Sequence, residues 1–173
     1  ILGLIYAKCD DFGARRAIVE NLLEEELGRQ SGVGRSHMEL YLEFGEALGI
    51  PRDQLTRAPM SVDATAMVHW MYWLADSKPW YVTLAGISLG SELFNPDAYV
   101  RVVRGLRQHY KLSDDGVRFF TVHIEVDKDH GDSSAGSIFR AIPESAAAET
   151  LWAVEMHIEF MRRLWSDINP PVA

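Results

Sequence analysis

Apolar side chains recur along the chain at the spacing of α-helices rather than that of β-strands. The first clear run covers residues 11–27 and ends at a glycine, Gly28. Positions three or four residues apart lie on one face of a helix, and a glycine after the last of them is a common helix end. The apolar positions of this run are Ala14, Ala17, Ile18 and Leu22.

Similar boundaries predict the other helices. Ser36 and Ser61 are expected N-caps, and Gly49 followed by Pro51 is a typical helix end. Asn95 is another expected N-cap, with Pro96 at the first helical position. The predicted ranges are 36–48, 61–76, 79–94, a helix beginning at 95–96, 113–130 and 143–167. Residues 30–34 are expected to form a break, and residues 132–136 a loop or a short helix.

This pattern predicts an all-α bundle of about seven helices, with β-hairpin signals nearly absent. No linker is long enough to divide the chain, so we expect a single helical domain over residues 1–173. The first six residues have the pattern of the middle of a helix and lack the basic segment of a signal peptide. We therefore expect part of the N-terminal helix to be missing from this sequence.

Composition narrows the classes of partner. The formal net charge is −8, and no cluster of Lys and Arg is present to neutralise nucleic-acid phosphates. No apolar run reaches about 18 residues, which argues against a membrane span. The single cysteine, Cys9, allows no intramolecular disulfide and fits a cytoplasmic setting. We therefore expect neither nucleic acid nor membrane as a partner.

The strongest chemical signal is the spacing of His123, Asp127 and His130. Positions i, i+4 and i+7 fall within an arc of about 60° on one helix face. Imidazole and carboxylate ligands together suit a redox-active divalent metal such as iron, whereas thiolates would favour zinc. The alternative is a solvated polar stripe, but the apolar side chains around it indicate a largely buried helix.

Two residues elsewhere could complete such a site. Glu92 ends an apolar helix, where a carboxylate is costly to bury unless it is paired or bound to a cation. His37 occupies the first turn of its predicted helix, just before an apolar run. Each has a simpler alternative, a carboxylate that reaches solvent for Glu92 and a surface histidine for His37.

Taken in order, these residues resemble the haem-oxygenase-like diiron oxidase and oxygenase family, whose helical fold is shared with thiaminase II and PQQ synthase. The resemblance covers nearly the whole chain and depends on Glu26-Leu27-Gly28, Ser36-His37-x-x-Leu40-Tyr41, Glu92 and His123-x3-Asp127-x2-His130. It implies a metal-ligand set of Glu26, His37, Glu92, His123, Asp127 and His130. Glu25 is nearly as good a candidate as Glu26, and the other glutamates of the 24–26 run are expected to be solvated.

The resemblance also implies a function. Two Fe(II) ions, the second less firmly held, would use O2 as co-substrate to oxidise, cleave or N-oxygenate a small organic molecule that is amino-acid-like or fatty-acid-like. Many relatives are dimers, so a homodimer is expected. A further carboxylate of the family, from a preceding core helix, would fall at or before Ile1.

Three other interpretations remain open at this point. Residues 86–90 spell G-x-S-x-G, the nucleophile motif of serine hydrolases, which needs a strand–turn–helix setting. A metal-free thiaminase-like enzyme would need an active-site cysteine, and Cys9 is in the wrong region. A non-catalytic or metal-free ligand-binding protein of the same fold is the third. His69 and His157 are expected to be hydrogen-bonded core residues, and the many aromatic side chains to belong to the core rather than to a pocket.

Overall fold

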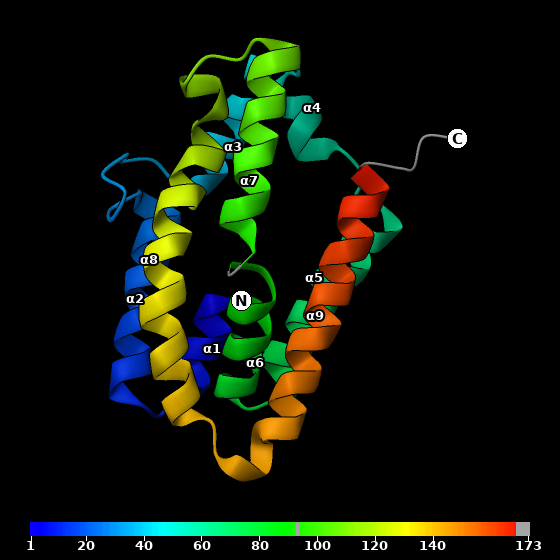
Figure 1. Cartoon of the computed structure of the whole chain (residues 1–173). Coiled ribbons are helices and arrows are strands. Elements are labelled where there is room, and N and C mark those ends of the chain that lie inside the picture. Colours follow the sequence, from blue (N-terminus) through cyan, green and yellow to red (C-terminus); the bar gives the residue numbers. More distant parts are fainter. Residues whose placement is uncertain (93, 169–173) are drawn as a thin grey trace. The chain divides into compact units, whose positions relative to one another are not determined.

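The computed structural model describes residues 1–92 and 94–168, apart from the side chains of residues 127–138, 167 and 168. The described residues contain helices and connecting segments and no β-strand (Figure 1). The predicted all-α class is therefore confirmed. The helices are α1 (Leu2–Lys8), α2 (Phe12–Leu27), α3 (His37–Ala47), α4 (Arg52–Arg57), α5 (Val62–Ser77), α6 (Trp80–Ile87), α7 (Asn95–Gly105), α8 (Arg118–Ala141) and α9 (Ala147–Ile168).

The number and ends of the helices differ from the prediction in places. Helix α1 lies where the first residues have a helical pattern, whereas the short helix α4 was not predicted. Helix α7 begins at Asn95 itself, so Phe94 and not Asn95 occupies the N-cap position. The predicted helix over 79–94 changes after Ile87 into a π-helical segment, η1 (Ser88–Glu92). Helix α8 passes through residues 132–136, so a loop there is wrong. A second π-helical segment, η2 (Leu106–Tyr110), follows α7, and short 3-10 turns precede α8 (η3, Asp115–Val117) and α9 (η4, Glu144–Ala146).

The chain forms two compact units, each made from several stretches of sequence. The first comprises Ile1–Ile18, Met60–Leu93 and Gly131–Ala173, and the second comprises Val19–Pro59 and Phe94–His130. Helices α2 and α8 therefore contribute residues to both. The prediction of one domain over 1–173 stays a prediction.

The core of the first unit lies where α5 and α6 pack against α9 (Figure 1). Its fully buried members are Leu74, Val82 and Ala153, and the ring of Trp70 stacks 5.4 Å from that of Phe160. Burial of this kind contributes about 1.5–3 kcal/mol for each large apolar side chain. Trp70 thus belongs to the core, as expected of the aromatic residues, whereas Trp73 and Tyr72 are exposed.

Lys8 also holds this unit together. Its ammonium group donates to the backbone carbonyls of Ala75, Asp76 and Lys78, at 3.0, 2.9 and 2.6 Å. These carbonyls lie at the C-terminal end of α5, where the last turn has no partners within the helix. A cation there satisfies the carbonyls and is favoured by the helix dipole.

The core of the second unit joins α3, α7 and α8. Leu40 of α3 packs against Val122 and Val126 of α8. The ring of Phe120, also on α8, meets that of Phe44 edge-on at 4.9 Å and packs with Val103 of α7. These contacts fix the faces of α3 and α8 toward each other, which positions the histidines described below.

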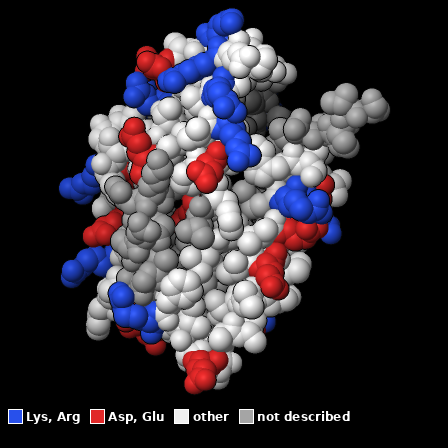
Figure 2. Space-filling view, viewed as in Figure 1, with Lys and Arg blue, Asp and Glu red and all other residues white. Residues whose placement is uncertain are grey.

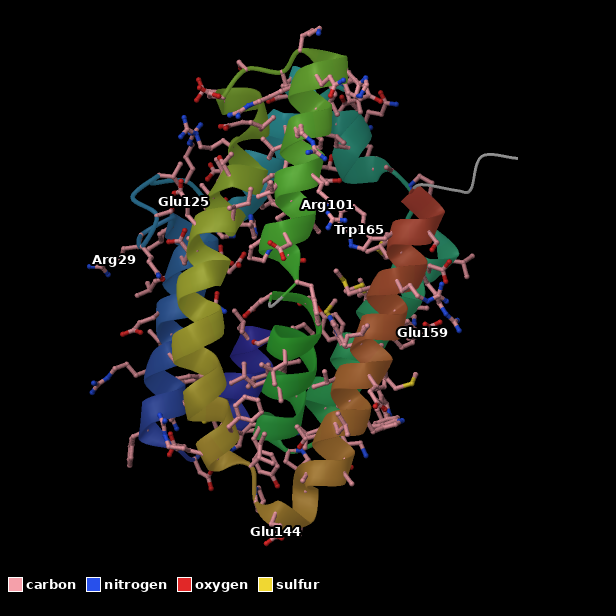
Figure 3. All side chains as sticks on the ribbon, viewed as in Figure 1. Arg29, Arg101, Glu125, Glu144, Glu159 and Trp165 are labelled. Carbon is pink, nitrogen blue, oxygen red and sulfur yellow. The ribbon has the colours of Figure 1, made fainter. Side chains whose placement is uncertain are left out.

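Charged side chains of both signs are distributed over the face shown in Figure 2. On α9, Glu159 pairs with Arg162 at 2.7 Å and with Arg163 at 2.9 Å, and Figure 3 shows Glu159 on the side of α9 away from α6. Within the part of the chain that the structure describes, no helix is long and apolar enough to cross a membrane.

Candidate metal centre

His37 is the first residue of α3, and the local sequence fixes its position. Ser36 is the N-cap: its hydroxyl accepts from the backbone N–H of Glu39 at 3.2 Å, and the Glu39 carboxylate accepts from the backbone N–H of Ser36 at 2.8 Å. This reciprocal pair satisfies two donors that the helix start would otherwise leave unpaired. The imidazole of His37 is therefore carried on a well-defined first turn, and it is 5% exposed.

Glu24, near the end of α2, supports the same histidine from one side. Its carboxylate is fully buried, with Oε2 accepting from the backbone N–H groups of Gln30 and Ser31 at 2.5 and 3.1 Å. Its Oε1 lies 3.2 Å from Nε2 of His37. Although burial opposes it, hydrogen bonds from Ser31, His37 and Gln30 lower the pKa of Glu24 below its ordinary value. An ionised carboxylate only accepts, so Nε2 of His37 carries the proton in this contact.

Glu25 approaches the other nitrogen of His37. Its Oε2 lies 3.1 Å from Nδ1, but Nδ1 is buried and the contact lacks the direction of a hydrogen bond. Burial opposes protonation of His37, yet the contacts and charges of Glu25 and Glu24 outweigh it and raise the pKa of this histidine. Two carboxylates thus make the space at Nδ1 favourable for a positive charge.

His123, on α8, completes the group. Its Nδ1 lies 2.7 Å from the carbonyl oxygen of Phe119 and must donate to it, which leaves the lone pair on Nε2. Its ring centroid is 4.3 Å from that of His37, and the rings of Phe119 and Tyr99 lie 4.5 and 5.8 Å away. Burial, and then the neighbouring His37, lower the pKa of His123.

Glu25, His37 and His123 form what we call the histidine–carboxylate cluster. One ligand atom from each lies within 4.8 Å of the other two. The buried Nδ1 of His37 has no hydrogen-bond partner among the described residues, and the proton positions assigned above turn a lone pair of each imidazole toward the cluster. Two imidazoles and one carboxylate are a donor set that iron accepts, so the residues present fit the metal.

Of the four other predicted ligands, the structure describes the side chains of Glu26 and Glu92. Glu26 is exposed, one residue further round α2, so Glu25 and not the favoured Glu26 reaches the two histidines. Glu92 is half-buried in η1 of the first unit, and its role as a ligand stays a prediction. The side chains of Asp127 and His130 lie outside the described residues.

The burial of Glu24 was not predicted from the sequence. Glu24 was expected to be solvated with its neighbours, yet it is the most buried of the three glutamates. His157 is buried as expected, but its two ring nitrogens have no hydrogen-bond partner among the residues that the structure describes, and His69 is exposed rather than in the core. A signal for Glu24 was the glycine-rich break beginning a few residues later, which supplies backbone N–H groups without regular partners.

The serine-hydrolase interpretation is wrong. Ser88 follows α6 in the π-helical segment η1, and no strand precedes it. A nucleophile on a strand–turn–helix elbow is therefore not formed.

The fold and the cluster together define the class as a helical protein with a candidate site for a redox metal. The chain matches the sequence model of the iron-containing redox enzyme family over residues 1–162 and belongs to that family. This confirms the resemblance inferred from the sequence, and the described helices agree with its haem-oxygenase-like fold.

Three chlamydial proteins are similar to the chain, and each is named 4-aminobenzoate synthase. The protein from Chlamydia pneumoniae is 34% identical over 129 residues, which is 75% of this chain and 55% of the relative. That from Chlamydia trachomatis serovar D is 28% identical over 147 residues, or 84% and 61%. That from Chlamydia muridarum is 30% identical over 131 residues, or 75% and 52%. The chain thus spans little more than half the length of these relatives.

Proposed function

We propose that the protein is an O2-dependent oxidoreductase with two irons, acting on a small organic molecule, and that the histidine–carboxylate cluster supplies ligands to one of them. The observation that carries the proposal is that one carboxylate and two imidazoles each bring a ligand atom within 4.8 Å of the other two, around the buried ring of His37. Membership of the iron-containing redox enzyme family supports the choice of metal. The other proposed ligands are Glu92, Asp127 and His130.

The protein residues prepare the site before any metal binds. Glu25 supplies negative charge beside His37, while Glu24 and the Phe119 carbonyl fix how the two imidazoles carry their protons. The rings of Phe119 and Tyr99 lie against the imidazole of His123 and form an apolar wall beside it. When bound, iron would supply a redox centre and open coordination positions for O2.

The names of the relatives give the first product to test. We propose formation of 4-aminobenzoate, or of a chemically similar aromatic amine carrying a carboxylate, as the activity to which this chain contributes. Fe(II)-loaded protein, incubated with O2, a reductant, a small carboxylated aromatic compound and an amine as nitrogen donor, should consume O2 and yield a product detectable by mass spectrometry. Release of 4-aminobenzoate would support the substrate class, and O2 consumption without it would reject that product while leaving the oxidoreductase.

Anaerobic titration with Fe(II), followed by measurement of protein-bound iron, tests the metal centre. We expect two irons per chain in the wild type and a loss of bound iron in His123→Ala. Glu125→Gln is the control, because Glu125 is an exposed carboxylate two residues further along α8 (Figure 3). One iron per chain would contradict the two-iron centre, and no bound iron would overturn the proposal in favour of a metal-free protein of the same fold.

A further inference from the structure

We propose that Glu24 is a positioning residue, which holds His37 in the orientation and proton arrangement that direct Nδ1 toward the metal. It is distinct from the predicted ligands, and the inference rests on the function proposed above. Glu24 joins three parts of the chain: the end of α2 that carries it, the backbone at Gln30 and Ser31, and the first residue of α3.

Because the Glu24 carboxylate is buried, it needs hydrogen bonds from the protein. The Glu24 side chain is 0% exposed, and an ionised carboxylate is strongly disfavoured in such a place unless hydrogen bonds replace its water. The contacts are divided between its oxygens, with Oε2 on the two backbone N–H groups and Oε1 on Nε2 of His37. Both oxygens are therefore occupied by protein donors.

The two nitrogens of the His37 ring face different carboxylates. Glu24 is 3.2 Å from Nε2, whereas Glu25 is 3.1 Å from Nδ1. The atoms that could hold a metal gather with Glu25 and His123, so Glu24 lies at the other edge of the ring. A carboxylate that accepts the N–H of a ligating imidazole fixes its tautomer and increases its basicity, and loss of such a partner costs about 10- to 100-fold in metal affinity.

The amide of Glu24→Gln changes this arrangement in a defined way. The backbone N–H groups of Gln30 and Ser31 require the amide oxygen, so the amide NH2 must face Nε2 of His37. Two donors cannot pair, and Nε2 therefore presents its lone pair to the amide while the proton moves to Nδ1. That proton occupies the position of the metal.

Three glutamates of α2 provide a matched set of variants for the test. We expect Glu24→Gln to weaken Co(II) binding by about 10- to 100-fold, without changing the number of ions bound at saturation. Glu25→Gln should change the Co(II) absorption spectrum, because a proposed ligand is replaced. The control is Glu20→Gln, at an exposed position one turn earlier on α2, and it should match the wild type. Equal Co(II) affinity in Glu24→Gln and wild type would overturn the proposal.

A second measurement uses the wild-type protein and does not depend on whether the variant folds. Long-range ¹H–¹⁵N NMR of the imidazoles, in metal-free protein at a pH where His37 holds a single proton and in Zn(II)-loaded protein, reports which nitrogen carries that proton. We expect the proton on Nε2 of His37 in both states. A proton on Nδ1 in the metal-free protein refutes the role of Glu24 even if no metal binds, whereas failure to bind metal with the proton on Nε2 refutes only the metal centre.

Discussion

His157 offers a direct test of how the first unit responds to acid. Its side chain is fully buried on α9, and within the described part of the chain neither ring nitrogen has a hydrogen-bond partner. A β-carbon on Gly90 of η1 would come within 2.9 Å of the β-carbon of His157, so the glycine permits a close approach. Burial lowers the pKa of His157 from 6.5 to about 4. We predict that His157→Leu makes the stability of the protein less sensitive to acid.

The sign follows from where the proton binds. Below pH 6.5 the unfolded chain takes up a proton at His157 that the folded chain accepts only near pH 4, so stability is lost as the pH falls through this window. For this pair of pKa values the loss, relative to pH 7, is about 2 kcal/mol at pH 5 and about 3 kcal/mol at pH 4. A leucine at position 157 removes this loss of stability at acid pH and also removes the two unsatisfied ring nitrogens of His157 from the core.

Urea unfolding at pH 7, 6 and 5 measures the effect. The free energy of unfolding of wild type should fall relative to that of His157→Leu by about 2 kcal/mol between pH 7 and 5, since the other titrating groups are common to both proteins. His69→Leu, at an exposed histidine of α5, is the control and should follow the wild type. Parallel pH profiles for wild type and His157→Leu would refute the assignment of a low pKa to the buried imidazole.

Two further predictions concern the backbone around the site and the support of α5. Gly28 has φ +55°, and a β-carbon there would lie 2.5 Å from the Arg35 carbonyl oxygen. Gly28→Ala should therefore destabilise the protein by about 2 kcal/mol or more and weaken Co(II) binding. Gly32→Ala has a similar φ of +69° but no atom within 4 Å, and urea unfolding should show a loss of only about 1 kcal/mol with unchanged Co(II) affinity. Lys8→Met removes three donors from the end of α5 and should cost about 1 kcal/mol, measured as a lower Tm.

Much of the helical framework could be predicted because helix ends are encoded locally. Ser36 and Ser61 cap helices in the structure as expected, and the chain turns at Gly28 and Gly49 with positive φ. The continuation of α8 through residues 132–136 was missed because small and polar residues there resemble a loop. The π-helical segment after Ile87 was missed because a change in hydrogen-bond register leaves the apolar pattern almost unaltered.

The candidate site was harder to predict than the fold for a geometric reason. Three consecutive glutamates point in directions about 100° apart on a helix, so a shift of one residue changes which of them faces His37. The choice depends on how the chain leaves α2 at Gly28 and returns at Ser36, and tertiary contacts decide that path. The result is a division of roles that composition does not reveal: Glu24 is buried, Glu25 reaches the histidines and Glu26 is exposed.

The helix cap at Ser36 affects both the stability of the fold and the position of a proposed metal ligand. Comparison with the cap at Ser61 distinguishes these two effects. Ser36 accepts from Glu39 N–H at 3.2 Å, and Ser61 accepts from Ala64 N–H at the same distance at the start of α5. Loss of either hydroxyl should therefore lower the free energy of unfolding by a similar amount, about 1 kcal/mol. Only Ser36, however, is followed directly by a proposed metal ligand.

Fraying of the first turn of α3 moves His37 away from Glu24 and Glu25, whereas fraying of α5 leaves the histidine–carboxylate cluster unchanged. We therefore predict that Ser36→Ala weakens Co(II) binding severalfold, while Ser61→Ala, matched to it in urea unfolding, binds Co(II) like the wild type. Equal Co(II) affinities in the two variants would mean that contacts with Glu24 and Glu25 position His37 without help from the cap. A loss of affinity confined to Ser36→Ala would show that the local sequence at the start of one helix sets the position of a metal ligand.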